Sequence, residues 1–109
     1  MISYDDFLKV EMEAGTVVSV EDFPEARNPA YKLKIDFGGE RILSSSAQIT
    51  AYYKKEDLLG KQVVAVTNFP PKRIAGFKSE CLVLGFQISP TGVVLIQPER
   101  PVPLGTRLF

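Results

Sequence analysis

The chain has 109 residues, of which 45% are apolar and 24% are charged, and this length is typical of one domain. It contains no histidine, which removes the usual general base and the commonest metal ligand, so we expect no enzyme activity, no metal and no cofactor. No apolar run approaches the ~20 residues that span a bilayer, and the first residues do not read as a signal peptide. The single cysteine excludes an internal disulfide. We therefore expect a cytoplasmic protein without membrane insertion.

Charge is unevenly distributed along the chain although the formal net charge is +0. Residues 1–25 hold seven acidic residues and one basic residue, whereas residues 26–109 hold six acidic and twelve basic residues. Such asymmetry can mark a basic face that binds phosphates or acidic peptides. Alternatively, the two sets interleave in space and cancel.

The N-terminal quarter predicts a short helix followed by a long strand. Ser3 can cap a helix, and two aspartates in the first turn suit the helix dipole. Residues 10–23 read as a strand, with Gly15 as the expected bulge or bend. Residues 24–29 form a predicted loop between two prolines.

The second quarter carries the clearest strand signal. Residues 31–37 alternate apolar and charged side chains, so one face should be buried and the other solvated. Gly38 and Gly39 then turn the chain into a hairpin partner at 41–44. Residues 45–53 are ambiguous.

The second half predicts further short strands. Residues 54–60 resemble one helical turn closed by glycine, and 62–67 read as a buried strand. Residues 68–75 hold two prolines and a Lys-Arg pair, which indicates a rigid basic loop, and 80–86 and 93–96 supply two more strands. Five or six short strands predict an all-β, closed or nearly closed barrel with short helices, and an open sandwich is the alternative.

Candidate catalytic groups have simpler structural interpretations. Cys81 lies within an apolar strand with no histidine to activate it, which favours a buried, inert thiol. The serines at 44–46 have no base nearby in sequence, and the carboxylate pairs lie at helix starts, where they cap. The sequence therefore favours a binding protein.

Residues 68–80, NFPPKRIAGFKSE, resemble the signature loop and strand of the tRNA-binding-domain family. Together with residues 22–27, 44–49 and 97–103, they are similar in register to the CsaA-type secretion chaperones. The resemblance implies one five-stranded oligonucleotide-binding (OB-fold) barrel over residues 1–109. It also implies a homodimer that binds unfolded or pre-export polypeptides and has a tRNA-binding ancestry. The implied dimer contact is made by the N-terminal segment and the C-terminal tail, at Phe7, Leu8, Pro101, Val102, Pro103 and Leu104.

Two positions depart from the family pattern. Cys81 and Leu82 stand where the family has Gly-Met, and Phe77 replaces a small or polar residue. Both changes put the close approach of an RNA backbone in doubt.

The residues themselves predict a peptide-binding surface on the 68–77 segment. Exposed apolar groups held by two consecutive prolines would lose little entropy on binding. The candidate peptide-binding residues are Gln48, Asn68, Phe69, Pro70, Pro71, Ile74 and Phe77. Phe69 and Phe77 could also be core residues, and Gln48 and Asn68 could instead satisfy backbone groups.

The alternative function is non-catalytic, structure-specific tRNA binding. A stripe of basic residues could follow an RNA backbone, although zero net charge is low for a strong nucleic-acid binder. The candidate tRNA-binding residues are Lys32, Lys34, Lys72, Arg73, Lys78, Ser79 and Leu82. A subunit-interaction domain is a third possibility. The apolar tail could pack across a two-fold axis or lie along its own barrel.

Overall fold

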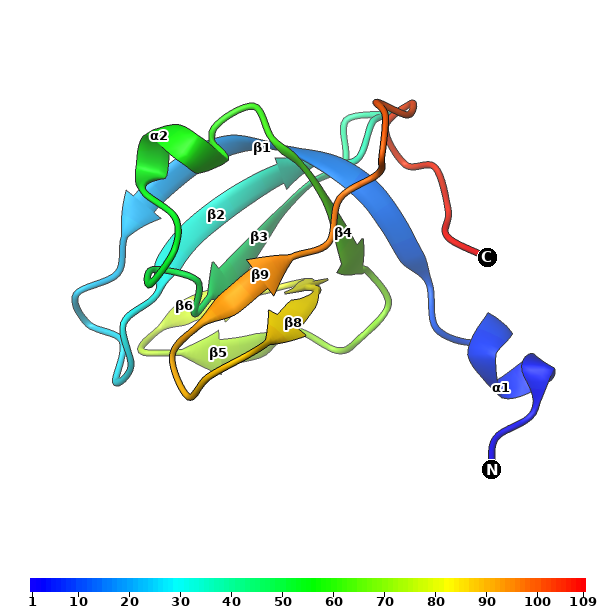
Figure 1. The fold of residues 1–109 in the computed structure, drawn as a ribbon, viewed down its shortest axis with the longest axis horizontal. Coiled ribbons are helices and arrows are strands. Elements are labelled where there is room, and N and C mark those ends of the chain that lie inside the picture. Colours follow the sequence, from blue (N-terminus) through cyan, green and yellow to red (C-terminus); the bar gives the residue numbers. More distant parts are fainter.

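The longest strand, β1 (Met12–Asp22), organises the fold because two different strands pair with its two ends. In the computed structural model, which describes residues 1–109, its second half pairs with β2 (Tyr31–Asp36) and its first half with β4 (Gln62–Val66). β2 continues into β3 (Ile42–Ala47), and β4 pairs with β7 (Leu82–Val83). The resulting antiparallel sheet, β3-β2-β1-β4-β7, curves strongly on itself (Figure 1).

The barrel closes where residues 79–81, between the end of β6 and the start of β7, lie against the edge strand β3. Glu80 N donates to Ser44 O at 2.8 Å, Ser45 Oγ donates to Cys81 O at 2.8 Å, and Ser46 N donates to Ser79 Oγ at 3.0 Å. Closure therefore uses backbone and side-chain bonds together. The prediction of an all-β OB-fold barrel is confirmed.

Two hairpins extend the barrel. β5 (Lys72–Ile74) pairs with β6 (Phe77–Ser79), and β8 (Gly85–Gln87) pairs with β9 (Val93–Leu95). The predicted loop at 68–75 is thus wrong in its second half, because the chain turns at Ala75 and Gly76, both at positive φ (48° and 82°). This is the geometry of a tight hairpin turn. The strand predicted at 80–86 is divided between β7 and β8.

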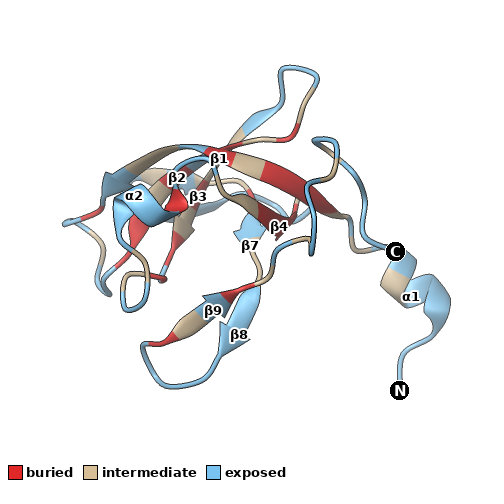
Figure 2. Cartoon of the chain, turned by 45° about the horizontal axis from the view of Figure 1, so that its top comes forward, coloured by how far each residue is buried: buried red, intermediate tan, exposed pale blue.

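The two predicted helices are present. α1 (Tyr4–Leu8) is capped by Ser3 Oγ, which accepts from Asp6 N at 3.1 Å, and α2 (Lys55–Leu58) precedes β4. α1 has no buried residue and projects from the barrel (Figure 2). No helix of this chain is both long and apolar enough to cross a membrane.

The core lies inside the barrel and is built by alternation along β2. Leu33 and Ile35 are almost fully buried, whereas Lys34 between them is exposed. Gly15 does not carry the predicted bulge, since the register of β1 shifts between Val17 and Ser19. A Cβ atom at Gly15 would lie 2.6 Å from Ile35 Cγ2, so this glycine makes room for core packing.

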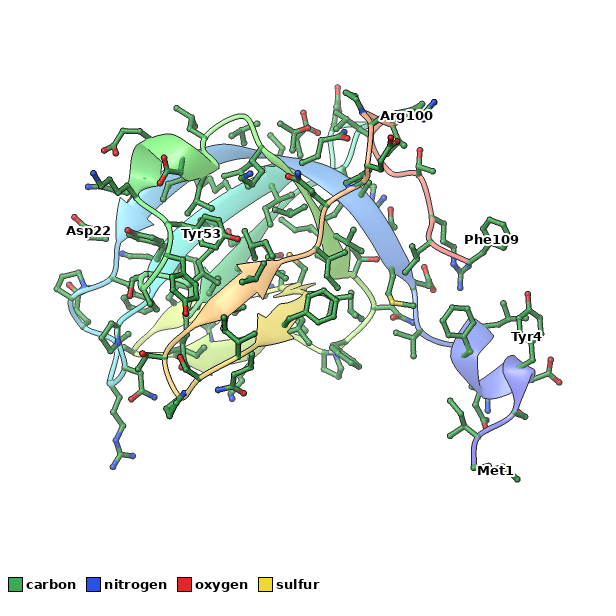
Figure 3. The ribbon with its side chains drawn as sticks, in the orientation of Figure 1. Met1, Tyr4, Asp22, Tyr53, Arg100 and Phe109 are labelled. Carbon is green, nitrogen blue, oxygen red and sulfur yellow. The ribbon has the colours of Figure 1, made fainter.

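The C-terminal tail lies along its own barrel. It occupies the edge of β1 that β2 leaves unpaired: Gly105 N donates to Ala14 O at 2.8 Å and Leu108 N donates to Met12 O at 2.8 Å. Gln62 binds both backbone groups of Val102, at 2.8 and 3.0 Å. The side chain of Phe109 nevertheless points away from the barrel and is almost fully exposed (Figure 3).

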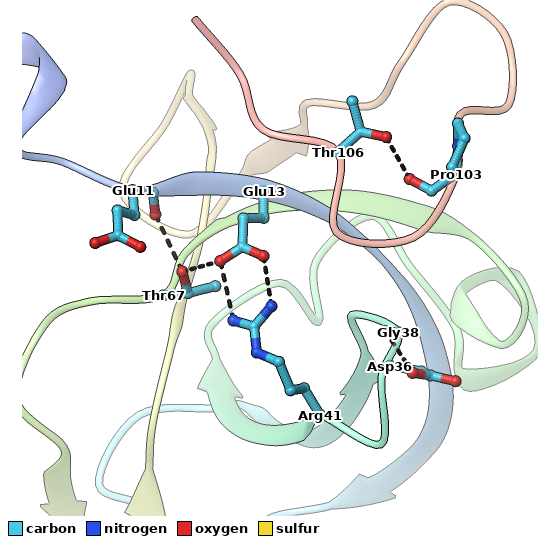
Figure 4. A network of polar contacts seen from close by, with 8 residues as sticks. All are labelled: Glu11, Glu13, Asp36, Gly38, Arg41, Thr67, Pro103 and Thr106. Atoms are coloured by element: carbon cyan, nitrogen blue, oxygen red, sulfur yellow. Dashed lines mark hydrogen bonds and ion pairs between the residues drawn. The ribbon is translucent and has the colours of Figure 1, made fainter.

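A buried carboxylate joins β1 to the hairpin between β2 and β3. Glu13 accepts two bonds from the Arg41 guanidinium, at 2.7 and 3.0 Å, and a further bond from Thr67 Oγ1 (Figure 4). These bonds, with Arg41 contributing most, hold the pKa of Glu13 below its usual value. Asp22 likewise pairs with Lys55 at 3.0 Å. Acids of the first segment therefore do interleave with bases of the rest.

Candidate binding site

The outer face of the barrel is the solvent-facing side of its sheet. Every second residue of β1, β2 and β3 lies on this side, and the β5–β6 hairpin extends it. Lys32 lies directly opposite Ser46, and Lys34 lies opposite Ser44, so these side chains share the solvent side of the sheet. The β5–β6 hairpin continues this face because β6 lies against β3. In OB barrels the face of strands two and three, with its flanking loops, is the usual ligand surface.

A pocket of about 300 Å³ opens on this face, between β3 and the β5–β6 hairpin. We call it the apolar pocket. It is lined by Ser46, Gln48, Phe69, Pro70, Lys72, Ile74, Ser79, Glu80, Cys81 and Leu82. The structure thus brings together four predicted peptide-binding residues and three predicted tRNA-binding residues in one site.

One wall of the apolar pocket is rigid. Phe69 is 49% exposed, and the two prolines after it restrict the backbone. Asn68 anchors this segment: its Nδ2 donates to Lys9 O at 2.8 Å and its Oδ1 accepts from Glu11 N at 2.9 Å. Asn68 therefore satisfies backbone groups and does not line the pocket, and Pro71 lies outside it as well.

Phe77 belongs to a separate cluster. Its half-buried ring packs edge-on against Phe23, with ring centroids 5.4 Å apart. The ammonium of Lys32 lies 5.1 Å from the Phe23 ring and 5.8 Å from the Phe77 ring, within the range of a cation–π interaction. Phe77 therefore packs against Phe23 at the outer face and does not line the apolar pocket.

The predicted basic stripe is split in two. Lys32, Lys34 and Lys72 lie on the outer face, while Arg73 and Lys78 are directly opposite each other on the reverse face of the hairpin. The four ion pairs of the chain use none of these five cations. No ion pair with a carboxylate neutralises these charges, so they can attract an anionic ligand.

Three residues of the apolar pocket were not predicted from the sequence to contact a ligand: Ser46, Glu80 and Cys81. Ser46 and Glu80 reach the site only because β3 closes against the segment after β6, a contact between residues more than thirty positions apart. Glu80 Oε1 accepts from Ser44 N at 3.0 Å. Burial raises the pKa of the Cys81 thiol to about 12, so it stays neutral and serves as part of the wall.

Residues 12–107 match the family described as "Putative tRNA binding domain". The chain belongs to this family. Among solved structures it is similar to the chaperone CsaA of Bacillus anthracis str. Ames, with 53% identity, a TM-score of 0.95 and coverage of 100% of this chain and 99% of that one. The CsaA chaperone of Picrophilus torridus is 50% identical, with a TM-score of 0.91 and full coverage of both chains.

The tRNA-binding-domain family also includes parts of much larger proteins. Methionine–tRNA ligase of Thermococcus onnurineus is 34% identical over 107 residues, which cover 98% of this chain and 14% of that protein. The chain therefore spans about 14% of the length of the curated relatives it matches. The resemblance to CsaA-type chaperones within this family is confirmed.

Proposed function

We propose that this chain is a cytoplasmic molecular chaperone that binds unfolded or pre-export polypeptides as a homodimer. The observation that carries this proposal is the apolar pocket, with Phe69, Pro70, Ile74 and Leu82 as its apolar walls. Its volume of about 300 Å³ suits one large side chain of a client. The similarity of the whole chain to two solved CsaA chaperones supports the same function.

The pocket has the properties that binding an unfolded segment requires. Its proline-restricted wall loses little conformational entropy when a client binds, and half of the Phe69 surface is free for contact. The unpaired lysines nearby would repel basic segments. We therefore expect clients whose exposed stretches are apolar and not basic.

Binding of tRNA is the second candidate. It is favoured by the five cations that form no ion pair and by the family to which the chain belongs. The split of these cations between two faces of the hairpin argues for the polypeptide, because a nucleic-acid backbone needs cations along one continuous path.

The deciding experiment compares Phe69→Ser with the native protein in two assays. We expect the variant to fold, since Phe69 is half exposed, and to lose most of its suppression of aggregation of a denatured client. Leu59→Ser removes a side chain that is more exposed than Phe69 and remote from the pocket, and this variant should act like the native protein. Bulk tRNA is titrated alongside at roughly 50 to 200 mM salt, where phosphate contacts give a steep negative slope.

Two results would contradict the chaperone proposal. One is full suppression of aggregation by a folded Phe69→Ser variant. The other is tight, strongly salt-dependent binding of tRNA together with no effect on the client, which would establish the second candidate.

A further inference from the structure

A second hollow lies beside the apolar pocket, and Gln48 belongs to the walls of both. We call it the amide hollow. It has a volume of about 230 Å³ and lies between the β1–β2 loop, the end of β3 and the β8–β9 hairpin. Its lining is Asn28, Pro29, Gln48, Thr50, Gln87, Pro90, Thr91 and Val93. None of these residues is charged.

The polar groups of the amide hollow are available for a ligand. No hydrogen bond within the chain uses the side chains of Asn28, Gln48, Thr50 or Thr91, and Gln87 makes only a long bond of 3.4 Å to Pro90 O. Five neutral amide and hydroxyl groups thus converge on a space large enough for one side chain. Such groups donate and accept hydrogen bonds without a charge.

Residues 46–50 connect the apolar pocket to the amide hollow, and their side chains alternate between outward and buried positions. Ser46, Gln48 and Thr50 are exposed or half-buried, whereas the intervening Ala47 and Ile49 are buried. The alternation of burial therefore places Ser46, Gln48 and Thr50 on the same outward side of the chain, although β3 itself ends at Ala47 and Thr50 lies in the turn that follows. Ser46 lines the apolar pocket, Thr50 lines the amide hollow, and Gln48 lines both.

We propose that the amide hollow is a second subsite, which takes a neutral polar side chain (Asn, Gln, Ser or Thr) of the polypeptide bound in the apolar pocket. This inference rests on the proposed function. A charged side chain would find no counter-charge in this lining. A polypeptide fits better than an RNA segment, because no lysine or arginine lines the hollow to hold a phosphate.

The two sites also restrict how many positions separate the two client residues that occupy them. In an extended polypeptide, side chains on one side are separated by an even number of positions. The apolar residue and the neutral polar residue of the client should therefore be two or four positions apart. A separation of three would turn one of them away from the surface.

The test measures dissociation constants of short peptides by fluorescence anisotropy. Each Ala-Gly host peptide carries one Leu and, at two, three or four positions on either side, an Asn, Ala, Asp or Lys. We expect Asn to bind about three- to tenfold more tightly than Ala at two or four positions and not at three. Asp and Lys should give no gain over Ala.

Variants of the protein test whether the preference for Asn over Ala arises in the amide hollow. In Thr91→Val and Gln48→Leu the ratio of the Ala to the Asn dissociation constant should fall to about one. Gln97→Leu, a matched change at an exposed glutamine outside both sites, should keep the native ratio.

The outcomes separate this inference from the proposed function. If the Leu peptides bind but Asn gives no advantage at any spacing, or if the advantage survives both variants, the amide hollow is not a client subsite. If no Leu peptide binds, the proposed function fails and this inference fails with it. If the variants weaken binding of a single-stranded oligonucleotide and leave the peptide ratio unchanged, the hollow belongs to RNA and the inference is overturned.

Discussion

Glu13 is the only charged residue among the buried residues of the chain. Its carboxylate is satisfied by Arg41 and Thr67, which come from two different loops of the barrel. Arg107 of the tail bridges to Glu13 through the backbone and adds favourable charge. One residue therefore ties the start of β1 to the β2–β3 turn, the end of β4 and the tail.

Because the pKa of Glu13 is lowered in the folded state, the unfolded chain binds a proton more readily. Stability from this carboxylate is complete above its ordinary pKa and is lost as the pH falls through the lowered native pKa. We expect Glu13→Gln to reduce the free energy of unfolding by about 1–3 kcal/mol at pH 7. The deficit relative to the native protein should shrink towards pH 3 in urea unfolding.

Asp22→Asn is the control for this prediction, since its ion pair with Lys55 is exposed on both sides. It should change stability by less than about 0.5 kcal/mol at either pH. An equal deficit for Glu13→Gln at pH 7 and pH 3 would show that the buried carboxylate does not titrate with folding.

At the scale of elements, prediction from sequence succeeded where the pattern was local. The alternation at 31–37 and the glycine pair after it were sufficient for β2, its turn and the first half of β3, whereas the second half of β3 fell in the ambiguous residues 45–53. The β5–β6 hairpin was missed because two prolines and a basic pair read as a loop, and Ala75 gave no signal of its positive φ. A turn with alanine at its first position depends on the strands that flank it.

The candidate site was predicted in part for the same reason. Phe69, Pro70 and Ile74 were found from their own character, since apolar side chains beside prolines indicate a surface. For Asn68 the sequence left two roles open, pocket lining or bonding to backbone groups, because its partners Lys9 and Glu11 are nearly sixty positions away. Contacts between segments so far apart in the sequence are absent from any local pattern.

Arg73 and Lys78 of the β5–β6 hairpin are the basis of a second stability prediction. Two like charges directly opposite in an antiparallel pair destabilise it. We expect Lys78→Glu to raise the free energy of unfolding by about 0.2–1 kcal/mol through a cross-strand pair. If the hairpin contacts tRNA phosphates, the same change should reduce the salt slope of tRNA binding by about one unit.

Lys61→Glu makes the same change in net charge at a site remote from the hairpin and is the matched control. Unfolding in urea and tRNA titration at several salt concentrations provide the two readouts. Equal effects of both variants would mean that net charge alone acts, and that the hairpin contributes no specific contact.

At the scale of the whole molecule, apolar side chains gather where the two termini meet. Arg107 Nη2 donates to Leu8 O at 2.6 Å, which fixes α1 beside the tail, and Tyr4 and Phe109 point outward there (Figure 3). Of the predicted dimer contacts, Leu8 is 41% exposed in this region and Phe7 is half-buried. Pro101, Pro103 and Leu104 are exposed further along the tail, and Val102 is half-buried beside Gln62.

A second copy would cover these apolar groups, as expected for a two-fold contact in which the same patch meets itself. We expect light scattering at micromolar concentration to give about twice the 12.1 kDa mass of the chain. Leu8→Asp and Leu104→Asp should each shift the particle towards the mass of one chain, because an aspartate in the contact would lose its hydration. Leu59→Asp, an exposed leucine near α2, should leave the mass unchanged. A native protein that stays at one chain mass on concentration, or a Leu59→Asp variant that dissociates as readily, would remove the termini as the dimer contact.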